Sequence, residues 1–505
     1  MIMNRLLEKA IAFEKEKISA YEPEKRPAFH LTGLTGWIND PNGLSFYDKR
    51  VHLFYQANLF DRQPGQICWG HAVTEDFVHW TYLPCALAPS EEYDRDGCFS
   101  GSALTTPDGR HLLMYTGYRE EKTGGNRQVQ CLAIGDGIDY MKYEKNPVLS
   151  FRDLPEGGSP EDFRDPRIWE EAGRYKAIVA NRAADGTGSL LVYESGDGFS
   201  WCFCGTLLAN KGRYGVMWEC PDLFSLDGTD ILLFSTQMST GCDPVFHPGF
   251  GTVCMHGRYE REYCRFVPEG AEPVDYGTDF YAPQTLLLPD GRRIMIAWMQ
   301  NWETSRTYRE DLAFNGQMTF PREITFRNGH LLQKPVRELE ACRGEHTAYE
   351  DIEVEGSMEL AGIGGRCIDL EVIIRPDEAA GGTKRFFIDV AAGENVRTTL
   401  EYDPVLSRLS IDRTESGFPY DIVNRRSMPV RLDRGKLGLR ILLDRYSMEV
   451  FVNGGEQAAS FVLYSPEDAD GIRFRSVGRM VIDAEQYTVK GAVPDYRSGD
   501  VINEV

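Results

Sequence analysis

Three short polar motifs each carry an acidic residue that could act as an acid, a base or a nucleophile. They are Asp40 in WINDPNG, Asp165 in FRDPR and Glu219 in WECPD. Taken singly, such motifs are more typical of turns, because Asp-Pro and Asn-Gly are common turn dipeptides. Two carboxyl groups in opposite protonation states on either side of a bond are, however, the working groups of glycoside hydrolysis. The three acids therefore predict a hydrolytic site if the fold brings them together.

The residues beside two of these acids suggest different protonation states. Trp218 and Cys220 flank Glu219, and an apolar setting favours the protonated carboxyl group that a general acid needs. Asn39 directly precedes Asp40, and amide donors favour the ionised carboxylate that a nucleophile or base needs. We therefore expect Glu219 to donate a proton and Asp40 to attack or to act as a base.

The third acid, Asp165, has an arginine on either side of it in the sequence. Arg164 directly precedes it and Arg167 follows two positions later. A nearby guanidinium group favours the ionised form of a carboxylate. We expect Asp165 to stay ionised and to anchor sugar hydroxyl groups rather than to donate a proton.

The acids occupy equivalent places in an internal repeat. Five apolar runs begin at His52, Leu112, Tyr175, Ile231 and Ile294, at intervals of 60, 63, 56 and 63 residues. Each run follows a polar motif by 10 or 12 residues, and the motifs are NDPNG, FSGS, RDPR, WECPD and YAPQ. Ser100 and Gln284 therefore stand where the other three copies carry an acid. We expect these two residues to form the sides of a channel that hold a sugar.

The repeat predicts a five-bladed β-propeller over residues 30–338. In the fourth copy, CPDLFSL and ILLFSTQ are two strands joined by the hairpin turn DGTD. Four-stranded sheets repeated around a channel form a propeller. The motif strands would line that channel, so the three acids would converge. A β-helix or a series of tandem sandwiches is the alternative, but neither would bring the acids together.

The segments on either side of the repeat have different patterns. Residues 1–29 predict a helical extension with an amphipathic helix, whose apolar residues include Leu6, Leu7, Ile11 and Phe13. Residues 345–495 alternate between apolar and polar, as in LGLRILLD and SMEVFVNGG, which is typical of a β-sandwich. The whole chain is therefore predicted to be all-β. The sandwich has no acidic motif, so we expect it to serve packing, stability or homo-oligomer contacts.

Composition argues against several kinds of partner and cofactor. A net charge of −22 over 505 residues argues against nucleic acid and anionic membranes. No apolar run has membrane-spanning or signal-peptide length, so a cytoplasmic location is expected. The 12 cysteines are scattered and are expected to be reduced. The 9 histidines lack metal-ligand spacing, so we expect neither a metal nor another cofactor.

Aromatic residues near the motifs are the candidates for a sugar-binding platform. They are Trp37, Trp69, Phe99, Trp218 and Trp298. The apolar face of a sugar ring packs on aromatic side chains, but aromatic residues in a β-protein are as often part of the core. Gln56, at the end of the first apolar run, could equally contact the sugar or form a hydrogen bond between blades.

Taken together, the motifs resemble those of glycoside hydrolase family 32, the β-fructofuranosidases. WINDPNG, WGHAVTEDFVHW, FSGS, FRDPR, WECPDLF and YAPQ occur in the order typical of that family. The resemblance implies a five-bladed propeller with a β-sandwich and no metal. It also implies release of terminal β-fructofuranosyl units, with retention, from sucrose or sucrose 6-phosphate.

The resemblance also assigns roles to individual residues. It makes Asp40 the nucleophile, Glu219 the acid/base and Asp165 the stabiliser of the transition state. The residues that would hold the fructosyl unit are Asn39, Gln56, Trp69, Phe99, Ser100 and Arg164. Two segments depart from the family pattern, LTGLTG before WINDPNG and Phe314 in place of a tryptophan. Both lie away from the acids and affect only the expected subsites beyond fructose.

Other functions stay open from the sequence alone. The enzyme could act on short fructo-oligosaccharides, inulin or levan, or transfer fructosyl units to another sugar. A different class of function would be a non-catalytic propeller that binds carbohydrate. A substrate phosphate would require cations beside the channel, for which Arg119, Lys122, Arg127 and Arg306 are candidates.

Overall fold

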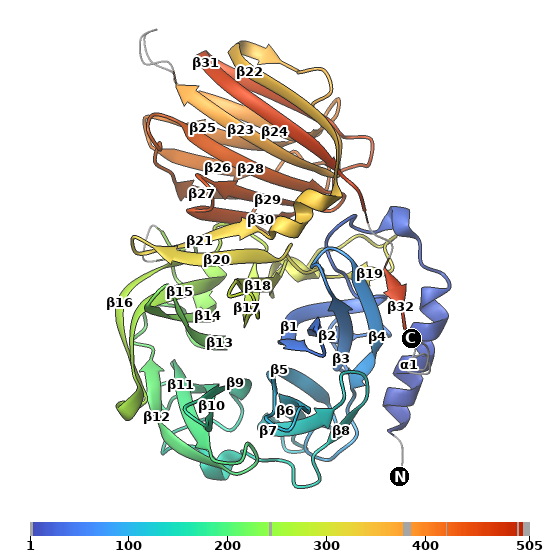
Figure 1. Ribbon diagram of the computed structural model, residues 1–505, viewed down its shortest axis with the longest axis vertical. Helices are drawn as coiled ribbons and strands as arrows, with labels where there is room; N and C mark the ends of the chain where they lie inside the picture. The colour runs from blue at the N-terminus through green and yellow to red at the C-terminus, as the bar shows by residue number, and fades with distance from the viewer. Residues whose placement is uncertain (1–3, 242–244, 377–384, 421, 492–493, 498–505) are drawn as a thin grey trace.

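Strands make up most of the protein. The structure, a computed structural model, describes residues 4–241, 245–376, 385–420, 422–491 and 494–497. A β-propeller forms the N-terminal part, and a sandwich-like sheet lies against one side of it (Figure 1). The predicted all-β class, with a propeller followed by a sandwich, is confirmed.

In the described part of the chain, four propeller sheets have four strands each and one has six. The second sheet along the chain contains β5 (Gly97–Thr105), β6 (His111–Glu120), β7 (Asn126–Gly135) and β8 (Tyr140–Lys142). The third contains β9 (Phe163–Glu171), β10 (Arg174–Arg182), β11 (Gly188–Ser195) and β12 (Trp201–Ala209). The fourth contains β13 (Met217–Leu226), β14 (Thr229–Ser239), β15 (Gly249–Glu260) and β16 (Arg265–Pro273). The last contains β17 (Tyr281–Leu287), β18 (Arg293–Trp298), β20 (Arg322–Arg327) and β21 (His330–Pro335).

The six-stranded sheet contains both an early and a late part of the chain. Its strands in spatial order are β19 (Phe314–Asn315), β1 (Gly36–Tyr47), β2 (Arg50–Asn58), β3 (Cys68–Thr74), β4 (Trp80–Leu87) and β32 (Asp495–Tyr496). β19 pairs in parallel with the start of β1. The segment that follows β18 therefore returns to the first sheet and closes the ring.

The apolar runs found in the sequence form the second strand of each sheet. In β10, Ala177 and Val179 pack toward the second sheet, whereas Ile178 and Ala180 pack toward the fourth. Successive side chains of a strand point to opposite faces. Because both faces of a blade are covered by neighbours, these strands are apolar at consecutive positions rather than at alternate ones.

The motif strands are the innermost strands of their sheets. β1 contacts β5, β5 contacts β9, β9 contacts β13, β13 contacts β17, and β17 contacts β1. Each of them also has an irregular register with its neighbour at the motif, between Ile38 and Pro41 in β1 and between Glu219 and Asp222 in β13, for example. Such β-bulges redirect side chains, here toward the axis of the propeller.

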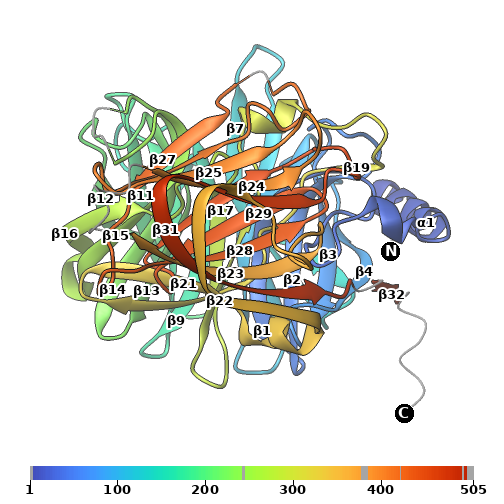
Figure 2. The ribbon, with the colours of Figure 1, turned by 90° about the horizontal axis from the view of Figure 1, so that it is seen from above.

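The N-terminal helix covers the outer edge of the six-stranded sheet. α1 (Arg5–Ile18) begins at Asn4, whose side chain accepts hydrogen bonds from the first turn of the helix. The carboxylate of Glu14 accepts a hydrogen bond of 2.9 Å from the backbone of Cys85 in β4. Burial raises the pKa of Glu14 to about 8. Figure 2 shows from a second direction that α1 lies outside the propeller, near β4 and β32.

The C-terminal sheet folds into a sandwich around the long strand β31. Its strands are β22 (Arg343–Met358), β23 (Ile368–Pro376), β24 (Arg385–Ala392), β25 (Thr398–Asp403), β26 (Arg408–Asp412), β27 (Arg425–Pro429), β28 (Leu437–Asp444), β29 (Ser447–Val452), β30 (Gln457–Val462) and β31 (Gly471–Val489). β31 pairs with β22, β23 and β24 along its length. One apolar core, with members on most of these strands, fills the sandwich.

A buried network of charged residues joins the propeller to the sandwich. His30 lies between two carboxylates of the sandwich, 2.8 Å from Asp444 and 2.9 Å from Glu449. Arg322 of β20 donates to Glu449 at 3.0 Å and to Asp275 at 3.0 Å. Burial alone would lower the pKa of His30, but its two carboxylate partners raise that pKa to about 9. His30 in turn lowers the pKa of Asp444 despite its burial, and Arg322 and His30 together lower that of Glu449.

Membrane helices, disulfides and metal clusters can be assessed only within the residue ranges that the structure describes. The structure shows no helix there with the length and apolar character needed to cross a membrane. The eleven cysteines in those ranges are free thiols, and Cys242 lies outside them. No group of three or more His, Cys, Asp and Glu side chains in the same ranges is arranged to hold a metal ion.

Candidate active site

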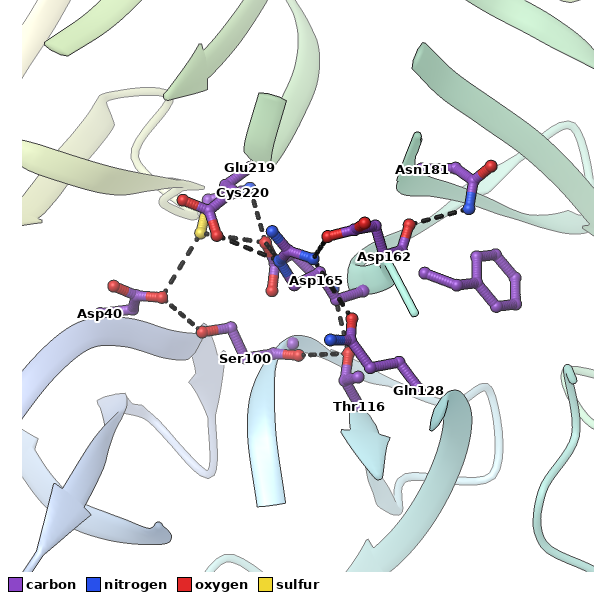
Figure 3. A network of polar contacts seen from close by, with 12 residues as sticks. Asp40, Ser100, Thr116, Gln128, Asp162, Asp165, Asn181, Glu219 and Cys220 are labelled. Carbon is purple, nitrogen blue, oxygen red and sulfur yellow. Dashed lines mark hydrogen bonds and ion pairs between the residues drawn. The ribbon is translucent and has the colours of Figure 1, made fainter. Parts of the chain in front are cut away.

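The three acids of the sequence motifs meet at the propeller axis. Asp40 lies on β1, Asp165 on β9 and Glu219 on β13, each near the start of its innermost strand (Figure 3). Cys220 connects two of them, because its Sγ lies 3.5 Å from Asp40 Oδ2 and 3.6 Å from Asp165 Oδ2. Its backbone N–H also donates to Asp165 Oδ2 at 3.0 Å. The bulges of the inner strands therefore gather the acids into one cluster.

The backbone at this cluster adopts an uncommon conformation. Asp165 and Cys220 have φ values of 61° and 49°, in the left-handed region that non-glycine residues seldom occupy. Such a conformation costs about 1–3 kcal/mol per residue and is found mainly at functional sites. The fold supports it here because the acids are fixed between neighbouring blades.

Asp40 is buried and has one free carboxylate oxygen. Its Oδ2 accepts a hydrogen bond of 2.6 Å from Ser100 Oγ, whereas its Oδ1 has no hydrogen-bond partner. Burial raises the pKa of Asp40 to about 6; the hydrogen bond from Ser100 opposes this effect and the charge of Glu219 adds to it. An ionised carboxylate with one unpartnered oxygen is suited to attack an electrophilic carbon.

A chain of hydrogen bonds holds Asp40 in place. Asn39 accepts from the indole of Trp37 at 2.8 Å and donates to Gln56 at 3.0 Å. Gln56 donates to Ser100 Oγ at 2.6 Å, and Ser100 in turn donates to Asp40. Gln56 therefore forms the expected hydrogen bond between blades, and its contact with a sugar stays a prediction.

Glu219 has polar partners instead of the apolar surroundings expected from its sequence neighbours. Its Oε1 accepts from Arg164 Nε at 3.0 Å and its Oε2 accepts from the hydroxyl of Tyr281 at 2.6 Å. Trp218 points away from the site, and its ring packs on Phe234 with centroids 4.3 Å apart. The expectation that Trp218 gives Glu219 an apolar setting was wrong, because adjacent residues of a strand face opposite sides.

Asp165 is not held ionised in the way that its flanking arginines suggested. Arg164 Nε lies 4.0 Å from Asp165 Oδ2, and Arg167 instead pairs with Asp222 at 2.9 Å. Burial raises the pKa of Asp165 to about 7; Arg164 opposes this effect, and the charge of Glu219 adds to it. The predicted low pKa was wrong because a single guanidinium does not offset burial beside two other acids.

Arg164 is the cation at the centre of the cluster. It donates to Glu219, to Asp162 at 2.8 Å and to Gln128 at 3.3 Å. Burial would lower the pKa of Arg164, but Glu219, Asp165 and Asp162 outweigh burial and raise it. Arg164 therefore stays charged and fixes the position of the Glu219 carboxylate.

The other predicted sugar-binding residues lie in less direct positions. Phe99 is half-buried and its ring stacks on Tyr118 with centroids 4.3 Å apart. Trp69 and Trp298 are fully buried, so contact between either ring and a sugar stays a prediction. The side-chain amide of Gln284 forms hydrogen bonds with the backbone of two strands. Its oxygen accepts from the N–H of Leu44, and its nitrogen donates to the carbonyl of Gly101. Its side chain thus ties β17 to β1 and β5, contrary to the expectation that it holds the sugar.

Three residues of the cluster were missed in the sequence. Tyr281 binds Glu219, Cys220 lies between two acids, and Asp162 orients Arg164. Tyr281 begins the YAPQ motif, so its place in the repeat was a usable signal. Asp162 lies two residues before Arg164, just ahead of β9, and its place in the sequence is a weaker signal. For Cys220, sequence alone suggested only an apolar neighbour.

Family models and relatives agree with this geometry. The model described as "Glycosyl hydrolases family 32 N-terminal domain" matches residues 30–335, and the model for the C-terminal part of the same family matches residues 338–490. The chain is 33% identical over 486 residues to a sucrose-6-phosphate hydrolase of Zymomonas mobilis, with 92% of each chain covered. It is 35% identical to a raffinose invertase of Escherichia coli, with 90% of this chain and 93% of that one covered.

Solved structures show the same relationship. A family 32 β-fructofuranosidase of Bombyx mori superimposes with a TM-score of 0.81 at 30% identity, covering 97% of this chain and 99% of that one. A sucrose-6-phosphate hydrolase of Lactobacillus gasseri superimposes with a TM-score of 0.83 at 25% identity, covering 96% of each chain. With both family models and these relatives matched over nearly its whole length, the chain belongs to glycosyl hydrolase family 32.

Proposed function

We propose that this chain is a β-fructofuranosidase that releases the fructosyl unit of sucrose or sucrose 6-phosphate. The observation that carries the proposal is the cluster of three acids on one axis, in which Asp40 keeps one carboxylate oxygen free. The names of the relatives support the substrate, since they include sucrose-6-phosphate hydrolases and an invertase for raffinose.

The proposed reaction has two steps, which together retain the configuration of the sugar. Asp40 Oδ1 attacks the anomeric carbon of the fructosyl unit while Glu219 gives its proton to the glycosidic oxygen, so that the other sugar leaves as an alcohol. Glu219, now a carboxylate, then takes a proton from water, and the water oxygen displaces Asp40. Fructose is released and both acids return to their starting states.

Other residues are assigned to binding in this proposal. Asp165 would accept hydrogen bonds from fructose hydroxyl groups and stabilise the positive charge that develops on the ring. Arg164 and Tyr281 would hold Glu219 beside the leaving oxygen, and Asn39 would approach the fructosyl unit next to Asp40. No metal or other cofactor is needed for any of these steps.

Two structural assignments belong to the same proposal. We count the six-stranded sheet as a fifth blade, supported by the closed ring of contacts among β1, β5, β9, β13 and β17. We also assign residues 30–338 to the propeller and 345–495 to the sandwich. A cytoplasmic location and self-association through the sandwich stay predictions from the sequence.

The test compares turnover of sucrose, sucrose 6-phosphate, 1-kestose and inulin by the purified protein. We expect fructose release from the first two to be fastest. Faster release from 1-kestose or inulin would identify a fructan hydrolase. Trisaccharides as the main product at high sucrose would identify a fructosyltransferase. Sugar binding without any fructose release would refute an enzymatic function.

A further inference from the structure

Four side chains of alternating charge lead from the acid cluster toward solvent. Arg164 pairs with Glu219 at 3.0 Å and with Asp162 at 2.8 Å. The other oxygen of Asp162 pairs with Arg182 Nε at 3.0 Å. The exposed fraction of these side chains is 11% for Glu219, 10% for Arg164, 16% for Asp162 and 40% for Arg182. The row therefore begins at a buried acid and ends at a cation in contact with solvent.

Arg182 lies on the side of its blade that faces Glu219. It is the last residue of β10, and Ile178 and Ala180, four and two positions earlier, pack in the same apolar cluster as Met217 and Trp218 of β13. Alternate residues of a strand share a face. Arg182 therefore projects from β10 toward the junction with β13, the strand that carries Glu219.

Two other arginines considered for a phosphate have carboxylate partners of their own. Arg119 pairs with Glu92 at 3.2 Å and with Glu121 at 2.9 Å. Arg127 lies 3.8 Å from Glu121 and 4.0 Å from Glu161. Within the described residues, Arg182 differs from both in having a single carboxylate partner, Asp162, which also pairs with Arg164. The charge of Arg182 is thus less compensated, and its side chain is not enclosed.

We propose that Arg182 binds a phosphate group on the leaving sugar and so selects sucrose 6-phosphate over sucrose. This rests on the proposed function, in which Glu219 protonates the glycosidic oxygen and the leaving hexose must lie against Glu219. Because fructose occupies the buried end of the channel, the hexose extends outward along the row that ends at Arg182. A guanidinium group can form two parallel hydrogen bonds with a phosphate, which makes it a strong and directional partner.

The test measures kcat/KM for sucrose 6-phosphate and for sucrose with the wild-type protein and with Arg182→Gln, Arg182→Lys and Arg127→Gln. We expect Arg182→Gln to lower the ratio of the two constants by about 10-fold or more, as for the loss of one charge-assisted contact. Arg182→Lys should lower it less, because lysine keeps the charge but not the two-pronged geometry. Arg127→Gln is the matched control, and the ratio should stay at its wild-type value.

Two outcomes would overturn the assignment. An equal loss for both substrates in Arg182→Gln would mean that Arg182 acts only through Asp162 and Arg164. An unchanged ratio would mean that the phosphate lies elsewhere or is not bound.

A binding measurement separates this inference from the proposed function. Titration calorimetry with glucose 6-phosphate, with glucose and with inorganic phosphate needs no turnover. We expect glucose 6-phosphate to bind more tightly than the other two, and Arg182→Gln to remove that advantage. If neither sucrose compound is hydrolysed but this pattern holds, the proposed function fails and the phosphate site stands. Equal binding of inorganic phosphate and glucose 6-phosphate would indicate a general anion site and overturn the proposal.

Discussion

The protein contains two buried clusters of charged residues, one at the propeller axis and one between the propeller and the sandwich. In the interdomain cluster every carboxylate has a cationic partner, since His30 pairs with Asp444 and Glu449, and Arg322 pairs with Glu449 and Asp275. The axial cluster places three acids around one arginine and leaves an oxygen of Asp40 unpartnered.

The pKa values shift in opposite directions in the two clusters. Cationic partners lower the pKa of Asp444 and Glu449 despite burial. Burial and neighbouring acids raise the pKa of Asp40 to about 6 and that of Asp165 to about 7. Removing one partner of a buried ion pair is strongly destabilising, whereas a buried charge without a partner already costs stability and is typical of functional sites. Substitutions in the two clusters should therefore affect different properties of the protein.

The largest effect is expected from Asp40→Asn. The amide cannot form the covalent intermediate, so kcat for sucrose should fall by about 10⁴-fold or more. The midpoint of thermal unfolding should stay the same or rise, because a buried, poorly compensated charge is removed. Initial rates of fructose release and calorimetry measure the two quantities. A large loss of stability would show that the axial cluster also holds the fold together.

Glu219→Gln is expected to have the next largest effect. Loss of a general acid lowers the rate by about 10²- to 10⁴-fold, whereas the amide oxygen of glutamine can still accept from Arg164 and its NH2 group can donate to the Tyr281 hydroxyl. With a substrate whose leaving group needs no proton, such as an activated aryl fructoside, the variant should form the covalent intermediate at a rate much closer to that of the wild type. Near wild-type turnover of sucrose by this variant would refute the role of Glu219.

Arg322→Met tests the interdomain cluster. It leaves Glu449 and Asp275 buried without their guanidinium partner, which should cost about 3–5 kcal/mol in the free energy of unfolding. Arg337→Met is the control, because Arg337 is exposed and pairs with Glu323 at the surface, a kind of pair that contributes about 1 kcal/mol or less. Urea denaturation measures both, and kcat at 25 °C should change little in either variant. Equal stability of the two variants would contradict the role assigned to Arg322.

The convergence of the three acids could be predicted from the sequence. Asp40, Asp165 and Glu219 share a position in a repeat, and a propeller places equivalent positions around one axis. The apolar runs could be placed as strands for the same reason, since burial on both faces requires consecutive apolar residues.

The partners of the acids could not be predicted in this way. The bond from Tyr281 to Glu219 joins residues on different sheets, 62 positions apart in the chain. Sequence neighbours were poor guides to surroundings, because Trp218 and Arg167 point to other partners. The interdomain cluster was also missed, since His30 lies 414 positions from Asp444 and neither stands in a motif.

The smallest expected effect is the pH dependence of the interdomain cluster. The pKa of His30 is raised in the folded protein from an ordinary value of 6.5 to about 9. The stability that protonated His30 contributes is therefore fully present below about pH 6.5, and it is lost as pH rises toward 9. The shift corresponds to about 3 kcal/mol at most.

The raised pKa values of Asp40 and Asp165 also make the folded protein less stable as pH rises. That loss is complete by about pH 7, below the range in which His30 titrates. A scan between pH 7 and 9 therefore separates the two clusters. The wild-type unfolding midpoint should fall across this range more steeply than that of His30→Gln, which has no such proton to lose. His79→Gln, at an exposed histidine that pairs with Asp76, should follow the wild-type curve. Parallel curves for the wild type and His30→Gln would mean that His30 is neutral in the folded protein, and Asp444 would then lack the cationic partner that the other two carboxylates of the interdomain cluster have in Arg322.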